Sequence, residues 1–401
     1  MGSGVVTEIA KGVYWVGVVD WGIRRFHGHE LSTHRGTSYN AYLILDDRAV
    51  LVDTVWAPFQ DQLLENIREV IDPARLDLVV ANHAEPDHSG SLPAIMRHCP
   101  DATVVVSKHG LESIPGHYHQ AWNFRAVGSG DRIPIGRGEM IFIEAPMLHW
   151  PDSMFTYLSG PNILMSNDAF GQHYAAGYRF NDQVDPQELH EEALKYYANI
   201  LTPFSPLVTK KIQEVLALGL PVSMIAPSHG ILWRTDPLQI VRQYQEWAAQ
   251  KGETRAVILY DTMWNGTRRM AEAIGRGLAA ENVPHKLLHM AVTDRNDAIV
   301  EIFRSKAVLI GSPTLNNGLL PTIMPILEDC RGLKFKNKIG AAFGSYGWSG
   351  EGVKLIEQHL AECRIPLAAE GVSAKWQPAP DDLTRCEALG RQVGQAVLRS
   401  N

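Results

Sequence analysis

The stretch NHAEPDHSGS, residues 82–91, places two histidines, a glutamate and an aspartate within six positions, from His83 to His88. It follows the apolar, β-branched run ARLDLVV, residues 74–80, which predicts a buried strand. It precedes GSLPAIMRH, residues 90–98, which predicts a turn that enters a helix. One such polar residue alone is more often solvated surface, but four on one strand-to-helix loop favour a metal site.

The composition is that of a globular protein of two domains, because the 401 residues are 45% hydrophobic and 20% charged. A net charge of −7 without a Lys/Arg block argues against nucleic acid as a partner. The N-terminal residues do not have the pattern of a signal peptide, and no run approaches the roughly 20 apolar residues of a membrane span. We therefore expect a cytoplasmic protein without a membrane partner.

The cysteines are Cys99, Cys330, Cys363 and Cys386, and none of them forms a C-x-x-C pair. This spacing argues against an iron–sulfur or rubredoxin-like site within the chain. We expect four reduced thiols.

Two halves of the chain differ in their pattern. Up to about residue 250, short strands such as those of YNAYLILDDRAVLVDTV, residues 39–55, alternate with helices. From residue 253 onward, strand, loop and helix repeat regularly, which is typical of an α/β domain with a doubly wound parallel sheet. We place a linker at residues 248–255, which separates domains 1–250 and 254–401.

Three further candidate ligands follow apolar strands in the first half. They are His149 in PMLHWPDS, Asp168 in LMSNDAFG and His229 in IAPSHGIL. With His83, Glu85, Asp87 and His88 they make seven, which is too many for one four-coordinate metal and suitable for two.

The first loop resembles the H-x-H-x-D-H motif of the metallo-β-lactamase superfamily, with Glu85 in place of the middle histidine. A carboxylate is a harder, anionic ligand that favours iron or manganese over zinc. The substitution therefore indicates redox chemistry rather than hydrolysis.

An H-x-E-x-D-H loop in such a domain, followed by a flavodoxin-like domain, resembles the flavodiiron proteins. The resemblance covers nearly the whole chain and includes DWGIRRFHG, GTSYNAYL, MLHWPDSMF, SNDAFGQH, YYANI, YDTMW, GSPTLNNG and FGSYGWSGE. It implies a metallo-β-lactamase-like αββα sandwich in residues 1–250 and a flavodoxin-like domain in residues 254–401. It also implies one iron held by His83, Glu85 and His149, a second held by Asp87, His88 and His229, and Asp168 as the bridge.

Two more residues match family positions that reach the substrate pocket, His27 and Tyr197. They would donate hydrogen bonds or protons to a bound ligand. For Tyr197, an aromatic side chain packed on a helix face is an equal alternative. The loop that holds His29 and His34 is longer than the family pattern, and we expect both to be ordinary loop histidines.

No G-x-G-x-x-G or Walker motif follows the strand AVILYD, residues 256–261, which argues against a dinucleotide or a nucleoside triphosphate. Instead TMWNGT, residues 262–267, offers hydroxyls and amides at a helix start, which suits one phosphate group or simple capping. GSPTLNNG, residues 311–318, and GSYGWSGE, residues 344–351, follow neighbouring strands, so all three loops meet at one edge of the sheet.

These loops resemble the FMN-binding loops of flavodoxins. One departure is Gly266, where the family usually has a hydroxyl residue. The expected FMN contacts are Thr262, Met263, Trp264, Asn265, Gly266 and Thr267, then Ser312, Pro313, Thr314, Leu315, Asn316, Asn317 and Gly318, and finally Ser345, Tyr346, Gly347, Trp348, Ser349 and Gly350.

The resemblance implies an oxidoreductase that reduces dioxygen to water, nitric oxide to nitrous oxide, or both, at a non-haem diiron site. Electrons would reach it through FMN from an external donor, either rubredoxin or a reduced deazaflavin coenzyme. It further implies a head-to-tail homodimer, or a tetramer built from it. Two alternatives remain: a zinc-dependent hydrolase with a flavodoxin-like docking domain, and an electron-carrier or gas-sensing module with an idle metal site.

Overall fold

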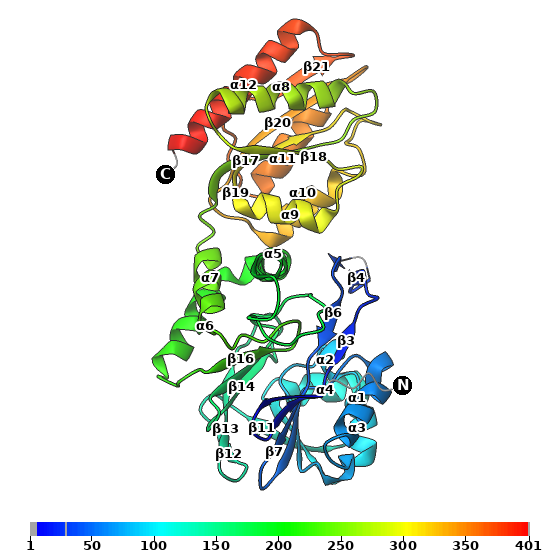
Figure 1. Ribbon diagram of the computed structural model, residues 1–401. Helices are drawn as coiled ribbons and strands as arrows, with labels where there is room; N and C mark the ends of the chain where they lie inside the picture. The colour runs from blue at the N-terminus through cyan, green and yellow to red at the C-terminus, as the bar shows by residue number, and fades with distance from the viewer. Residues whose placement is uncertain (1–5, 29, 400–401) are drawn as a thin grey trace. The chain divides into compact units, whose positions relative to one another are not determined.

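Two hydrophobic cores form in the computed structural model, which describes residues 6–28 and 30–399. The first unit comprises Met1–Tyr196 and Phe204–Gln245, and the second comprises Tyr197–Pro203 and Glu246–Asn401 (Figure 1). The predicted linker, residues 248–255, spans the end of α7 (Gln239–Ala248) and the start of β17 (Glu253–Tyr260). The division therefore falls slightly before the predicted boundary, and a short segment after Tyr196 joins the second unit.

The first unit contains a mixed seven-stranded sheet in the order β1-β2-β7-β8-β9-β10-β11. Neighbours from β1 to β8 are antiparallel, whereas β8 to β11 are parallel. The strands are β1 (Thr7–Ala10), β2 (Val13–Trp15), β7 (Tyr42–Leu45), β8 (Ala49–Val52), β9 (Leu78–Ala81), β10 (Thr103–Ser107) and β11 (Asn123–Val127).

A five-stranded sheet in the order β12-β13-β14-β15-β16 faces the first sheet across a shared core. Val80 and Val105 of the larger sheet and Phe142 and Met165 of the smaller one belong to this core, so the predicted sandwich is confirmed. The strands are β12 (Arg132–Pro134), β13 (Glu139–Glu144), β14 (Met154–Leu158), β15 (Ile163–Asn167) and β16 (Met224–Pro227).

Short helices and two small ribbons complete the first unit. The ribbons pair β3 (Val18–Asp20) with β6 (Thr37–Tyr39) and β4 (Arg25–Phe26) with β5 (Leu31–Ser32). The helices, besides α7, are α1 (Gln60–Arg68), α2 (Pro86–Ser89), α3 (Leu92–His98), α4 (Gly110–Tyr118), α5 (Pro186–Tyr196) and α6 (Ser205–Ala217).

The second unit has a five-stranded, fully parallel sheet in the order β18-β17-β19-β20-β21. β19 (Ser305–Gly311) is buried along its whole length, as expected for a central strand with helices on both faces. The other strands are β18 (His285–His289), β20 (Ile339–Tyr346) and β21 (Val372–Lys375).

Helices cover both faces of this sheet, so the predicted doubly wound domain is confirmed. α8 (Gly266–Ala280) and α12 (Pro380–Arg399) pack together on one face and contribute to the core there (Figure 1). α9 (Arg295–Arg304), α10 (Met324–Leu333) and α11 (Gly352–Glu362) lie on the other face (Figure 1).

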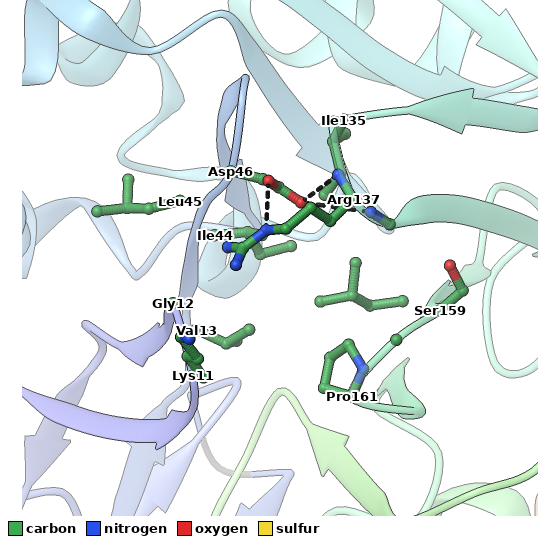
Figure 2. Close-up of a pocket in the computed structure, with 13 residues that line it drawn as sticks. Lys11, Gly12, Val13, Ile44, Leu45, Asp46, Ile135, Arg137, Ser159 and Pro161 are labelled. Carbon is green, nitrogen blue, oxygen red and sulfur yellow. Dashed lines mark hydrogen bonds and ion pairs between the residues drawn. The ribbon is translucent and has the colours of Figure 1, made fainter.

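One pocket of about 180 Å³ lies at the turns between strands of the first unit (Figure 2). The β14–β15 turn contributes to it, whereas His149 lies on the connection at the opposite end of β14. Arg137 reaches across the pocket wall to Asp46 through its backbone and side-chain nitrogens (Figure 2). None of the predicted site residues lines this pocket.

Neither a membrane-spanning helix nor a disulfide bond is found among the described residues. Among the residues that the structure describes, no helix combines the length and apolar character of a membrane span. All four cysteines are free and buried, as expected for thiols.

Candidate functional site

The loop after β9 and the short helix α2 that follows it carry four buried ionisable side chains, His83, Glu85, Asp87 and His88. Glu85 adopts an extended backbone conformation at the N-cap, and Pro86 begins the helix. This turn brings His83, before the helix, close to His88, within it, with ring centroids 5.7 Å apart. Burying so many charged groups is costly unless a cation or other partners balance them.

The first group of ligand atoms consists of His83, Glu85 and His149. Glu85 Oε2 lies 3.1 Å from His83 Nε2 and 3.4 Å from His149 Nε2. Three ligand atoms from two loops therefore point at one small volume, and a metal ion there would have both imidazole and carboxylate ligands.

The second group consists of Asp87, His88 and His229. Asp87 Oδ2 lies 3.3 Å from His88 Nε2 and 3.0 Å from His229 Nε2. His229 comes from the loop after β16, so this group also joins segments that are distant in the sequence.

Asp168, which follows β15, faces both groups with different oxygens. Its Oδ2 lies 3.7 Å from His83 Nε2 and 3.6 Å from His149 Nε2. Its Oδ1 lies 2.9 Å from His88 Nε2 and 3.6 Å from His229 Nε2. One carboxylate thus spans two ligand sets, in the grouping that the family resemblance implies.

Several polar atoms of this cluster have no hydrogen-bond partner among the described residues. Asp87 Oδ1, Asp168 Oδ2 and both ring nitrogens of His88 are buried without a hydrogen-bond partner among the described residues. The 2.9 Å contact between His88 and Asp168 therefore lacks hydrogen-bond alignment. Buried, unpartnered polar atoms that lie this close together fit the ligands of a common cation.

The electrostatics of the cluster favour cations. Burial raises the pKa of Asp168, but the neighbouring charges, His88 first, outweigh it and hold that pKa well below its usual range. Burial lowers the pKa of His88, yet Asp168 and Asp87 raise it to about 10. A set of four imidazoles and three carboxylates fits two iron ions.

A second layer of hydrogen bonds fixes the imidazole rings. His229 Nδ1 donates to the Ser38 carbonyl oxygen at 2.8 Å, so Nε2 is the ring nitrogen that faces the other ligand atoms. His83 Nδ1 lies 3.2 Å from Asp152 Oδ1, and Asp152 Oδ2 accepts from the Ala84 backbone N–H at 2.7 Å. These supporting residues were not predicted, although Asp152 lies in the PMLHWPDS segment beside His149.

The loop that carries His229 is held by the segment GTSYNAYL. Asn40 Nδ2 donates to the carbonyl oxygens of Pro227 and Gly230, at 2.8 and 3.1 Å. The Gly230 N–H donates to Ser38 Oγ at 2.7 Å. Gly230 has a φ of +73°, and a side chain there would collide with Gln172, so only glycine permits this close approach.

His27 contacts the cluster from the β4–β5 hairpin. Its Nε2 lies 2.9 Å from Glu85 Oε1, the carboxylate oxygen that does not face His83. Burial lowers the pKa of His27, but the hydrogen bond to Glu85 and the charge of Glu85 raise it above the usual value. His34 is exposed, and His29 lies outside the described residues.

Two adjacent tyrosines, Tyr196 and Tyr197, have different neighbours. The Tyr197 ring packs against Trp247 and Phe303 of the second unit, with centroids 5.4 and 5.8 Å away. The Tyr196 ring lies 6.4 Å from that of His229. Tyr196 is the last residue of α5, and Tyr197 begins the π-helix η3 (Tyr197–Leu201), so the two side chains point in different directions.

His173 is a further site neighbour that the sequence did not single out. Its buried ring lies 4.7 Å from His229 and 5.3 Å from Tyr196. Nδ1 lies 2.8 Å from Thr37 Oγ1. Burial and the neighbouring His229 hold the pKa of His173 well below its usual value, so it is neutral.

In the second unit, the three predicted flavin loops follow β17, β19 and β20 at the same edge of the sheet (Figure 1). They adjoin one another, because Thr314 N donates to Ser345 O at 2.9 Å and Thr267 Oγ1 lies 3.1 Å from Ser345 Oγ. Asn316 and Asn317 have positive φ, which asparagine tolerates better than most residues.

The residues at this edge fit a flavin phosphate and ring. Thr262 Oγ1 is buried without a partner among the described residues, close to the first turn of α8. Trp264 and Trp348 are 82% and 92% exposed, so both have faces free to cover a flat ring. A Cβ at Gly266 would lie only 3.3 Å from Ser345 Oγ, so the missing side chain leaves space where a hydroxyl residue would crowd the neighbouring loop.

Comparisons with known families support both domains. Residues 37–230 match a family described as ODP family beta lactamase, and residues 258–390 match the flavodoxin family.

Relatives similar over nearly the whole chain are reductases. A nitric oxide reductase of Moorella thermoacetica is 51% identical, with 97% of this chain and 98% of that protein covered. An anaerobic nitric oxide reductase flavorubredoxin of Klebsiella pneumoniae is 48% identical, with 96% of this chain and 81% of that protein covered.

Two solved structures are similar to this chain over nearly its whole length. The rubredoxin oxygen:oxidoreductase of Desulfovibrio gigas superposes with a TM-score of 0.96 at 36% identity and covers 98% of this chain and 99% of its own. The flavodiiron protein of Giardia intestinalis superposes with a TM-score of 0.94 at 33% identity, covering 98% and 97%. These comparisons give no support to the zinc hydrolase alternative.

Proposed function

The chain belongs to the flavodiiron protein family, and on that premise we propose that it reduces dioxygen to water, nitric oxide to nitrous oxide, or both. It is an oxidoreductase whose cofactors are FMN in the flavodoxin-like domain and two non-haem irons in the lactamase-like domain. We propose that rubredoxin or a similar external donor supplies the electrons.

The observation that carries this function is the position of Asp168. Its two oxygens face two separate sets of imidazole and carboxylate ligands, so the site is built for a pair of metal ions rather than one. Three carboxylates among seven ligands favour iron over zinc. Paired irons suit a reaction that needs several electrons at one place.

When bound, the irons and FMN supply the electrons, four to convert dioxygen to two waters or two to convert two nitric oxides to nitrous oxide and water. The role of the chain is to hold these groups and to exclude competing reactions. Glu85 is oriented by His27 through one oxygen, which directs the other oxygen towards His83 and His149.

Protons must also reach the site, because both reactions form water. We propose that His27 and Tyr196 donate hydrogen bonds or protons to the substrate side of the pocket, in place of the expected pair His27 and Tyr197. The hydrogen bond between His27 and Glu85 and the exposed rim on which His27 lies support its role. The ring of Tyr196 beside His173 and His229 supports the second assignment.

We propose a head-to-tail homodimer, or a tetramer built from it, in which the flavin of one chain serves the irons of the other. Exposed Trp264 and Trp348 at the flavin loops support an interface there. Light scattering should give about twice the chain mass of 44.5 kDa or more, and a monomer in solution would contradict the proposal. A cytoplasmic location, which the four free cysteines support, is tested by cell fractionation.

The test of function combines composition with turnover. Protein purified without oxygen should contain about two irons and one FMN per chain, and should oxidise reduced rubredoxin when either gas is added. The ratio of the two turnover rates then assigns the preferred gas. An Asp168→Asn variant that retains both irons and full turnover would contradict the assignment of the site, and a zinc-containing, flavin-free protein would contradict the function.

A further inference from the structure

The flavin loop after β17 begins with a carboxylate to which the proposed function gives no role. Asp261 is the last residue before TMWNGT, and it is only 6% exposed. Its Oδ1 accepts a hydrogen bond from the Thr262 backbone N–H at 2.7 Å. A carboxylate close to a phosphate site repels the phosphate dianion, so the direction of its oxygens and their hydrogen bonds matter for binding.

Two side chains from other segments bind this carboxylate. His289, the last residue of β18, places Nε2 3.0 Å from Asp261 Oδ1, and because a carboxylate oxygen accepts, the ring N–H donates. The Thr322 hydroxyl donates to Asp261 Oδ2. The His289 ring is fixed in turn by the Tyr260 ring, which is stacked on it at 5.3 Å and 10° between planes.

These contacts decide which atom Thr262 can offer to a ligand. Its N–H is turned back to Asp261, whereas its Oγ1 is buried without a partner among the described residues. Thr262 therefore has its hydroxyl rather than its amide available to a ligand, in the loop that leads into α8, whose N-terminus favours a phosphate.

We propose that Asp261, His289 and Thr322 form a positioning group that fixes Thr262 for the phosphate of FMN. Within this group, His289 and Thr322 hold the carboxylate in place through hydrogen bonds, so that the loop stays formed beside a dianion. The inference rests on the proposed function only in that FMN is the flavin, and it does not depend on the metal site or on the gas reduced.

The experiment separates phosphate recognition from ring recognition. Full-length protein freed of flavin is titrated with FMN and, separately, with riboflavin, which lacks the phosphate, and binding is followed by quenching of flavin fluorescence. His289→Ala should raise the FMN dissociation constant roughly tenfold or more, the usual effect of losing a charged hydrogen bond, and change that of riboflavin by less than about twofold. His289→Gln, which keeps a donor, should recover most of the FMN affinity.

The matched control is His285→Ala at the other end of the same strand, where the ring contacts Val283 O and not Asp261. It should leave both affinities unchanged. Thr322→Val keeps the shape of the side chain but removes the donor to Asp261, so it should raise the FMN dissociation constant in the same selective way. This variant provides the test if His289→Ala does not fold. If His289→Ala and Thr322→Val bind FMN normally, or if both variants bind FMN and riboflavin equally weakly, the proposal is overturned. A protein that binds flavin normally but does not reduce either gas would contradict only the proposed function.

Discussion

Replacing Asp152 by asparagine should weaken one metal site while leaving the other nearly intact. Asp152 is buried, and its two oxygens accept from His83 Nδ1 at 3.2 Å and from Ala84 N at 2.7 Å. Ser113 Oγ also donates to Oδ2, at 3.1 Å. An asparagine has one acceptor oxygen on that side chain, so it can serve His83 or Ala84 but not both.

The expected loss of metal affinity in Asp152→Asn follows from the one N–H donor that is left without an acceptor. A buried N–H that loses its partner costs about 1–3 kcal/mol, which corresponds to roughly 5- to 150-fold in an equilibrium constant. Loss of a carboxylate behind a metal-bound histidine typically costs about 10- to 100-fold in metal affinity. Because Asp152 contacts His83 and not His88 or His229, we expect the ion held by His83, Glu85 and His149 to be lost first.

The assay is iron content per chain after anaerobic equilibration with a competing chelator at increasing concentration. Over a range in which the native protein keeps two irons, Asp152→Asn should fall to about one. Asp182→Asn is the control, because that carboxylate binds Arg234 at the surface and contacts no candidate ligand. Retention of both irons with native affinity, or parallel loss of both, would refute the reasoning that one carboxylate supports one of two sites.

Three further predictions concern other parts of the chain. Tyr196→Phe should lower the turnover rate by roughly tenfold or more, because a proton donor is lost, whereas Tyr197→Phe should retain near-native turnover. If steady-state assays show that Tyr197→Phe is the slower variant, the assignment of the two tyrosines is reversed. Glu85→His should retain two irons but lose reductase activity, because the contact from His27 to the carboxylate disappears; full activity with two irons would mean that the carboxylate is not needed for redox chemistry. Burial lowers the pKa of Lys338 to about 7, so between pH 7 and about 10.5 the unfolded chain binds this proton more tightly than the folded chain does. The free energy of unfolding of the second unit should therefore rise by ~2 kcal/mol from pH 7 to pH 9, relative to Lys338→Met. Denaturant titrations that show no such difference would mean that the buried ammonium group stays charged.

Much of the architecture could be predicted because strands and helices have different apolar periods. The buried run of β19 and the repeated strand, loop and helix pattern indicated a parallel sheet covered on both faces, and the structure has one. The seven ligand candidates were found in the same way, since polar residues directly after apolar strands gather at the strand ends. The supporting residues, among them Ser38, Asp152 and His173, carry no such local signal, because what matters in them is a contact with a distant segment.

Residue types and strand periodicity are local properties, so the chemistry of the ligands, the order of the two domains and the loops that form each site could be inferred from the amino-acid sequence. Which atoms meet depends on how distant segments pack, and that is known only from the fold. Asp168 acts on both ligand sets because its two oxygens point in different directions between loops far apart in the chain. Tyr196 and Tyr197 contact different rings because adjacent residues of a helix point about 100° apart, and the packing at the end of α5 fixes which rings each one meets.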